Sequence, residues 1–365
     1  MLRRRGHAVE VLGFDNEAVA GVAGRVASTA SAFYSIPSHR RVSAALKSFR
    51  PEMLHVHNFL PTLSPAVFFA ATEAGVPVVQ TLHNYRLICA NAQLFREGRV
   101  CELCREQRSI LPGIRFGCYR GSRLGSAVVG ASMAVQAGLG TWERRVARYV
   151  ALSEFAATKL GEFRVPRERI RIKPNFVPDG GTGKGLGGYA LFVGRLSEEK
   201  GLDTLLAADR LGRIPMPVRI VGDGPLRSKM EEGCAREGSQ LVFCGPKSAA
   251  EVRELMKEAM ALLVPSLWYE GFPMVMVEAL SLGLPVIASR IGGLPEIVED
   301  GVCGLLHDPG SPEALLGALC AMEELCAAAG AAMRSEARGR YLERYSEEVN
   351  HAQLLAIYQE AIHAS

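Results

Sequence analysis

Two glutamates, Glu270 and Glu278, stand eight positions apart in the segment EGFPMVMVE. The apolar run before them, residues 261–266, predicts a strand. Pro273 suits the first position of a following helix, because its missing N–H would be unpaired there anyway. Backbone N–H groups at a helix start favour a phosphate. One carboxylate beside that site and one behind it could bind hydroxyls on either side of a diphosphate, which is the layout of a nucleotide-sugar.

Arg195 and Lys200 form a second candidate cluster, in the segment LFVGRLSEEKG (191–201). Both follow an apolar run that predicts a buried strand. Two cations at such a strand end need an anionic partner, because unpaired charge there is costly. The alternative is an ordinary surface pairing with Glu198 and Glu199.

Two glycine-containing segments complete the pattern. IVGDGPL (220–226) predicts another strand, ending in a glycine turn at Asp223, and GGLPEIVEDGVCGLL occupies 292–306. With the E-x7-E pair and the FVGRL-x-x-EKG segment, they make four motifs in one order. The chain therefore resembles the retaining glycosyltransferases of family 4, which have the GT-B fold. The resemblance implies transfer of a sugar from a UDP- or GDP-sugar to an acceptor, with retention of configuration.

The resemblance also implies roles for single residues. Glu278 would bind the ribose hydroxyls, since a carboxylate can accept two hydrogen bonds from a vicinal diol. Glu270 would hold sugar hydroxyls and charge near the anomeric carbon. His83 matches a catalytic-site histidine that would bind the donor sugar or the acceptor, although a lone histidine is commonly structural. The residues expected at the donor are Arg195, Lys200, Asp223, Gly271, Phe272, Pro273, Met274, Val275 and Glu278.

Catalysis is expected to need no metal and no cofactor beyond the donor. Many sugar transferases hold a metal with Asp-x-Asp, a motif that does not occur in this chain. Negative charge develops on the leaving diphosphate, so fixed positive groups must stabilise it. Arg195, Lys200 and the backbone at Pro273–Val275 are the candidates.

Four cysteines suggest a separate, structural metal site. Cys89, Cys101, Cys104 and Cys118 are spaced C-x11-C-x2-C-x13-C. A C-x2-C pair is a common chelate, and four thiolates suit tetrahedral zinc. Zinc could cross-link a loop that cannot build its own core. Scattered thiols and a redox pair are the alternatives.

Short apolar runs alternate with helical stretches and predict parallel sheets covered on both faces. The expected strands are 8–14, 53–58, 77–84, 149–153, 189–194, 217–222, 240–245, 261–266, 285–289 and 304–308. We expect an α/β protein of the GT-B type, with two Rossmann-like, doubly wound domains facing a central cleft. The expected parts are a domain at 1–177, a glycine-rich linker at 178–188, a domain at 189–345, and a helix at 346–365 that crosses back to the first domain.

Charge is distributed unevenly along the chain. Residues 1–180 hold 25 Lys and Arg against 13 Asp and Glu, and the remainder holds 17 against 25. The basic half suits an anionic membrane surface or a lipid-diphosphate acceptor, although a basic surface without a partner has the same signature. Nucleic acid is not an expected partner. No signal peptide follows the basic start, and nine cysteines fit a reduced compartment. We expect a cytoplasmic protein, free or on the inner face of a membrane.

The start of the chain departs from the family pattern. MLRRRGHAVEVL (1–12) resembles the end of the family's first helix. The first strand and its glycine-rich loop are therefore expected to be missing, either because the start is truncated or because the protein has lost this part of its site. That loop helps to cover the donor diphosphate. A nucleotide-sugar-binding protein impaired in catalysis is therefore an alternative, as is a GT-B relative such as a sugar-nucleotide epimerase. The motifs do not fix the base, the sugar or the acceptor, which would be a polysaccharide, a lipid-linked sugar or a small molecule.

Overall fold

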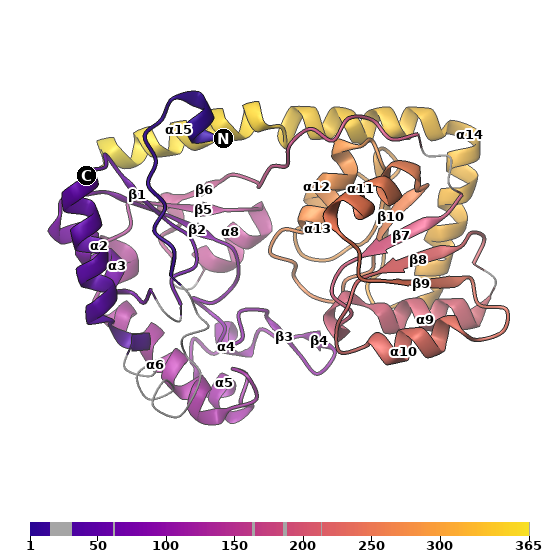
Figure 1. The fold of residues 1–365 in the computed structure, drawn as a ribbon. Helices are drawn as coiled ribbons and strands as arrows, with labels where there is room; N and C mark the ends of the chain where they lie inside the picture. The colour runs from indigo at the N-terminus through magenta and orange to yellow at the C-terminus, as the bar shows by residue number, and fades with distance from the viewer. Residues whose placement is uncertain (15–30, 61–62, 163–164, 185–187, 213, 365) are drawn as a thin grey trace. The chain divides into compact units, whose positions relative to one another are not determined.

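The computed structural model describes residues 1–14, 31–60, 63–162, 165–184, 188–212 and 214–364 (Figure 1). By their contacts the residues form two compact units. The first comprises Met1–Leu94, Cys101–Lys173 and His351–Ser365, and the second Phe95–Val100 and Pro174–Asn350. The domain limits and linker predicted above stay predictions, and residues 185–187 of that linker lie outside the described residues.

The first unit is built on a four-stranded parallel sheet in the order β1-β2-β5-β6. All five residues of β2 are buried, as expected of an interior strand covered on both faces. Val79 of β2 and Val150 of β5 pack with Ile357 and Ala361 of the last helix. The strands are β1 (Leu54–Val56), β2 (Val78–Leu82), β5 (Arg148–Ala151) and β6 (Ile170–Ile172). The helices are η1 (Leu2–Arg5), α2 (Ile36–Phe49), α3 (Ala66–Glu73), α6 (Arg123–Gly138), α7 (Thr141–Arg144), α8 (Glu154–Gly161), η3 (Arg167–Arg169) and α15 (Glu347–His363).

The prediction of a strand over residues 8–14 is wrong, and β6 was not predicted. Residues 8–14 form a mostly apolar run, but no strand of the described structure pairs with them, and Val11 is exposed. A short apolar run forms a strand only where a neighbouring strand completes the hydrogen bonds. Strand β6 has only three residues, a length at which periodicity carries no signal.

The cysteine-containing segment of the first half has little regular structure. Its elements are the hairpin strands β3 (Phe95–Arg96) and β4 (Arg99–Val100), and the short helices α4 (Leu103–Glu106) and α5 (Leu111–Arg115). The non-glycine residues in this segment with positive φ are Ala92, Leu94, Glu97, Arg108 and Arg120. Such backbone is unfavourable for residues with a side chain, so other contacts must hold the segment in place.

The second unit is built on a six-stranded parallel sheet in the order β12-β11-β10-β7-β8-β9. The strands are β7 (Ala190–Val193), β8 (Val218–Val221), β9 (Leu241–Gly245), β10 (Ala261–Val264), β11 (Val286–Ser289) and β12 (Gly304–His307), all at positions predicted from the sequence. The helices are η4 (Glu198–Lys200), α9 (Leu202–Leu211), α10 (Arg227–Cys234), α11 (Ala249–Glu258), α12 (Met274–Ser281), α13 (Leu294–Ile297) and α14 (Pro312–Arg344).

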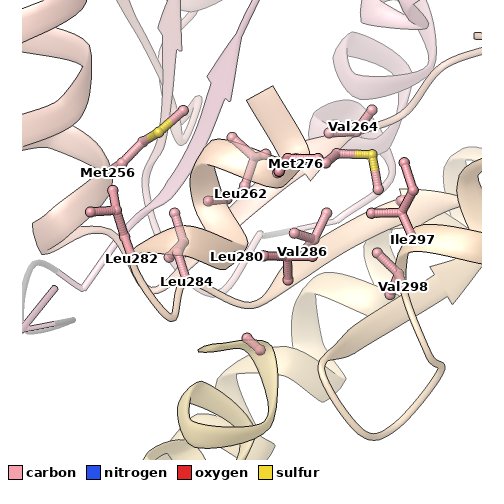
Figure 2. Packing of buried hydrophobic residues seen from close by; sticks show 14 of the residues in the cluster. Met256, Leu262, Val264, Met276, Leu280, Leu282, Leu284, Val286, Ile297 and Val298 are labelled. Carbon is pink, nitrogen blue, oxygen red and sulfur yellow. The ribbon is translucent and has the colours of Figure 1, made fainter. Parts of the chain in front are cut away.

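Both faces of this second sheet are packed. Leu262 and Val264 of β10 belong to one buried cluster, while Ala261 and Leu263 belong to another. Figure 2 shows the first cluster, in which Leu262 and Val264 lie close to Met276 of helix α12. This packing fixes the start of α12 against the end of β10, where the candidate residues lie.

One helical stretch, Pro312–His363, is long and apolar enough by length and composition to cross a membrane. This observation is weak evidence, because core helices of soluble proteins pass the same test. Leu315, Leu319 and Met322 of α14 belong to a buried core cluster of the second unit, while 17% of the most apolar 18-residue window of the stretch is buried.

Candidate functional site

The loop after β7 is bonded to the loops of both neighbouring strands. On the β8 side, the Leu196 N–H donates to the Asp223 carbonyl at 2.9 Å, and the Leu226 N–H donates to the Leu196 carbonyl at 2.8 Å. On the β10 side, the Leu267 N–H donates to the Glu199 carbonyl at 2.9 Å. Because β7 lies between β10 and β8, three loops meet at the carboxyl edge of the sheet, where ligands bind in open α/β sheets.

Lys200 and Glu270 form a buried ion pair at this edge. Lys200 Nζ lies 2.7 Å from Glu270 Oε1, and the Ser266 hydroxyl donates to the same oxygen at 2.6 Å. The Glu270 side chain is 6% exposed and that of Lys200 is 23% exposed. Glu270 Oε2 accepts no hydrogen bond from the described residues. Because Lys200 pairs with Glu270, it does not form the alternative surface pairing with Glu198 or Glu199.

Arg195 and Asp223 lie on the exposed side of the same loops. No hydrogen bond or ion pair of the Arg195 side chain is found within the described part of the chain. Asp223 Oδ1 accepts a hydrogen bond from the Gly224 N–H at 2.8 Å, and its other oxygen lies 3.7 Å from Arg227. Arg195 is therefore a cation whose charge is available to an anion at the end of β7.

Helix α12 begins beside the ion pair and has no side-chain cap. Its first residue is Met274, one later than predicted, and Pro273 is the cap residue. The first N–H groups of a helix have no partner within it. Of these N–H groups, only that of Met276 has a partner among the described residues, the Pro273 carbonyl at 3.1 Å. Within this part of the chain, unpaired N–H groups thus remain at the helix start, near Gly271 and Phe272, which are half-buried.

Glu278 lies in the second turn of α12 with its side chain exposed. Desolvation by the surrounding chain raises the pKa of its carboxyl, and the charge of Arg253 opposes that shift. Its carboxylate makes no hydrogen bond or ion pair with any described residue. A partly desolvated carboxylate without a partner is unfavourable in the unbound protein, so a ligand is the natural source of compensation.

Gly201 holds the loop that carries Lys200 against the end of β10. Its φ is +72°, and a Cβ there would lie 1.8 Å from the Pro265 carbonyl oxygen. We expect Gly201→Ala to lower the free energy of unfolding by about 2 kcal/mol, and the melting temperature with it, because both backbone strain and a backbone clash must be relieved. Calorimetry on the full chain measures this loss.

Gly238→Ala is the matched control, because Gly238 has φ +78° but nothing within 4 Å of its Cβ position. It should show the strain of the left-handed backbone alone, about 1 kcal/mol. Equal losses in the two variants would contradict the close approach of Gly201 to Pro265.

Three histidines lie together in the first unit at the ends of β1 and β2. His55 Nδ1 lies 2.7 Å from the Tyr358 hydroxyl of α15, and its Nε2 lies 2.7 Å from Thr81 Oγ1. His57 Nδ1 lies 2.8 Å from His83 Nε2. The rings of His55 and His57 stack with centroids 4.4 Å apart, and those of His57 and His83 with centroids 5.1 Å apart. His83 is thus one member of a cluster, and the contact with His57 was not predicted.

The histidine cluster is held in the neutral form. Burial, with the charges of neighbouring histidines and Lys173, lowers the pKa of His55 to about 3 and that of His83 to about 4. The pKa of His57 is also lowered, chiefly by burial. Lys173, directly after β6, is buried, and this lowers its pKa to about 8. The sequence missed Lys173 because the short strand β6 before it was not recognised; a basic residue after that strand would have been the signal.

The four cysteines of the predicted zinc site lie in one neighbourhood but do not form a metal-binding set. Burial raises the pKa of Cys104 to about 11, and Cys89, Cys118 and Cys101 add to this shift, so all three thiols lie within its electrostatic reach. None of the four forms a disulfide in the described structure, and all four are half-buried. Within the described residues, no three His, Cys, Asp or Glu side chains are placed to hold a metal ion. The structure therefore does not show the predicted zinc site.

Two family models match the chain. The model "Glycosyltransferase Family 4" matches residues 1–179, and "Glycosyl transferases group 1" matches residues 186–337. The chain belongs to the group 1, or family 4, glycosyltransferases. The family resemblance inferred from the four motifs is thus confirmed.

Curated relatives match part of the length of this chain. It is 41% identical over 128 residues to the uncharacterized glycosyltransferase MJ1178 of Methanocaldococcus jannaschii, covering 35% of this chain and 36% of the relative. It is 33% identical over 179 residues to D-inositol 3-phosphate glycosyltransferase of Mycobacterium tuberculosis strain F11, covering 47% and 37%. The matched region thus spans little more than a third of these relatives.

Solved structures confirm the fold. The chain resembles Anabaena Alr3699/HepE in complex with UDP, with a TM-score of 0.65 and 19% identity over 88% of this chain and 82% of that one. A glycosyltransferase from Rickettsia africae gives a TM-score of 0.68 and 15% identity over 90% and 82%. The predicted GT-B architecture, an α/β fold with two domains on parallel sheets, is confirmed by these neighbours.

Proposed function

We propose that this glycosyltransferase moves a sugar, with retention of configuration, from a UDP- or GDP-sugar to a polysaccharide, lipid-linked or small-molecule acceptor. The observation that carries the proposal is the Lys200–Glu270 pair beside the uncapped start of α12. A cation, a buried carboxylate and free backbone N–H groups at one sheet edge match the charge pattern of a nucleotide-sugar. The UDP complex of the Anabaena neighbour supports such a donor.

In this proposal the second unit holds the leaving diphosphate. Bond cleavage leaves negative charge on the diphosphate, and Arg195, Lys200 and the N–H groups at Pro273–Val275 stabilise it. Glu270 keeps Lys200 oriented through Oε1, and its Oε2 accepts a hydrogen bond from a sugar hydroxyl. With these fixed positive groups and no Asp-x-Asp motif, we propose that turnover needs no divalent metal and survives EDTA, unless the chelator removes a structural zinc.

The remaining predicted residues take supporting roles. Glu278 accepts hydrogen bonds from the ribose hydroxyls, and Asp223 belongs to the glycine turn on the β8 side of the donor. His83 binds a hydroxyl of the donor sugar or the acceptor. Its neutral imidazole, held so by the lowered pKa, can either donate or accept that hydrogen bond.

The experiment that tests this function is release of nucleoside diphosphate with and without an acceptor. UDP- and GDP-sugars are first ranked by their thermal shift, and the best donor is then assayed with candidate acceptors. The mycobacterial relatives' name makes a phosphorylated polyol one acceptor to include. Acceptor-dependent release supports the proposal. Donor binding without turnover would instead indicate a binding protein, and conversion of the donor without release would indicate an epimerase.

We also propose that the enzyme works in the cytoplasm, with its basic half against an anionic membrane surface. The excess of Lys and Arg in residues 1–180 supports this placement. Cosedimentation with vesicles of anionic lipid, but not with vesicles of zwitterionic lipid, is the expected result. Equal partition onto both kinds of vesicle would contradict it.

For the segment containing Cys89, Cys101, Cys104 and Cys118, we propose that zinc, when bound, draws the thiols together. Cys89 and Cys104 line one small cavity. A Cβ on Gly113 would lie 3.5 Å from Cys104 Sγ, and the Cys118 N–H donates to the Gly113 carbonyl at 3.0 Å. The segment's short elements and positive φ angles are what a cross-link would stabilise.

We expect purified protein to contain about one zinc per chain, and Cys104→Ser to lose the metal and lower the melting temperature, because metal binding adds to folding free energy. Elemental analysis and calorimetry measure these effects. Cys244→Ser, in β9, is the control and should keep the metal. Well-folded protein without zinc would refute this proposal, and alkylation without reductant would then separate free thiols from a disulfide.

A further inference from the structure

We infer that His57 is a positioning residue, which fixes the ring nitrogen and the tautomer that His83 presents to substrate. The inference rests on the proposed function, in which His83 binds a substrate hydroxyl. Its basis is the hydrogen bond between His57 Nδ1 and His83 Nε2, at 2.8 Å. Because that bond occupies Nε2, only Nδ1 of His83 is left for a substrate. Nδ1 has no hydrogen bond with any described residue.

The position of His57 is itself fixed from the other side. Its ring stacks on His55 with an interplanar angle of 21°. His55 has both ring nitrogens bonded, to Tyr358 of α15 and to Thr81 of β2, so it cannot rotate without breaking hydrogen bonds. The stacked pair of His55 and His57 is therefore anchored in β1, β2 and α15, and the His57 ring is held where its edge meets His83.

A single proton is shared across the bond between His57 and His83, and its position decides the chemistry. If His57 donates from Nδ1, His83 accepts at Nε2 and carries its own proton on Nδ1, so it donates to substrate. If His83 donates from Nε2, its Nδ1 is an acceptor. His83 must be neutral in both arrangements, to accept from His57 in the first and to present a free Nδ1 in the second. Desolvation is the main cause that lowers the pKa of both His57 and His83. The charge of Lys173 adds to both shifts, and that of His57 adds to the shift of His83.

Amide side chains can test this assignment nitrogen by nitrogen. The amide of asparagine occupies roughly the place of Nδ1, and that of glutamine roughly the place of Nε2. His57→Asn can therefore keep a hydrogen bond to His83, while His57→Gln and His57→Phe cannot. His83→Asn keeps a polar atom toward the substrate, and His83→Gln keeps one toward His57.

We expect His57→Gln and His57→Phe to lower kcat by about 10- to 100-fold, the usual effect of removing a residue that orients an active group, with donor affinity and melting temperature unchanged. His57→Asn should retain most of the activity, and His83→Asn should be more active than His83→Gln. Losing the charge of His57 also raises the pKa of His83, so the acid limb of the kcat profile should move to higher pH in His57→Phe. His363→Asn, exposed in α15, is the control.

Nitrogen NMR of the histidine rings gives a readout that does not depend on turnover. We expect one tautomer of His83 in the wild type and in His57→Asn, and a changed tautomer ratio in His57→Gln. An unchanged His83 spectrum in every His57 variant overturns the inference whether or not the protein is active. If the His83 spectrum changes with His57 but the protein releases no nucleoside diphosphate, the positioning contact is supported and the proposed function is overturned instead. Equal activity of His57→Asn and His57→Gln also counts against the inference.

Discussion

Lys200→Met should lower the turnover of sugar transfer by about 100- to 1,000-fold, the loss typical when one fixed group that stabilises developing negative charge is removed. Lys200 is the cation that the described structure holds in place by a hydrogen bond to Glu270 at 2.7 Å. Its effect should fall on kcat more than on affinity for the donor, because the diphosphate gains charge as the bond to the sugar breaks. Steady-state release of nucleoside diphosphate, with acceptor present, measures both constants.

The same substitution leaves the buried Glu270 without its cation, which by itself can cost about 3–5 kcal/mol of stability. The double variant Lys200→Met/Glu270→Gln separates the two effects. Glutamine keeps the shape of Glu270 and can still accept the hydrogen bond from Ser266, so the double variant should regain stability and remain inactive. Turnover restored in the double variant would mean that Lys200 serves only to neutralise Glu270. Lys229→Met, an exposed lysine of α10 paired with Asp203, is the control.

Arg195→Ala also removes a positive charge expected to stabilise the diphosphate, but it leaves no buried carboxylate without its partner. The Arg195 side chain has no partner within the described residues, so its removal should leave the melting temperature unchanged. A fall in turnover at unchanged stability would then report lost stabilisation of the leaving group alone.

The second sheet could be predicted from the sequence because each of its strands is a short apolar run followed by a polar loop. The strands of a parallel sheet buried on both faces are typically such continuous apolar runs. Arg195, Lys200 and Glu270 follow strands that turned out to be neighbours, and the convergence of their loops follows from that order. The motif spacing thus carried real three-dimensional information for this unit.

Contacts between side chains distant in sequence could not be predicted in the same way. His55 and Tyr358 are 303 positions apart, and the hydrogen bond from Ser266 to Glu270 depends on the curvature of one loop. Nothing in local periodicity reports either contact. The cysteine spacing predicted a zinc site, which the described structure does not show, because spacing alone does not set the distances between sulfur atoms.

Glu278→Ala should weaken the binding of nucleoside diphosphate by about 10- to 100-fold, or about 1.5–3 kcal/mol, the usual range for a hydrogen bond to a charged group. The carboxylate is exposed and has no partner within the described structure, so its removal takes nothing from the fold. Titration calorimetry with UDP and GDP measures the loss directly. Glu278→Gln should fall between the wild type and the alanine variant, because an amide accepts from a diol without the charge.

The unbound protein gives the decisive comparison for Glu278. Desolvation raises the pKa of this carboxyl, which means that its ionised form is less favourable in the folded chain than in water. At neutral pH, Glu278→Gln should therefore leave the melting temperature equal or higher while lowering nucleotide affinity. Opposite effects on stability and affinity indicate a residue that serves binding and not folding. Glu336→Ala, an exposed glutamate of α14 also without a partner among the described residues, should change neither quantity. Unchanged affinity in Glu278→Ala would remove the ribose assignment, and a loss of stability would show that the side chain serves the fold instead.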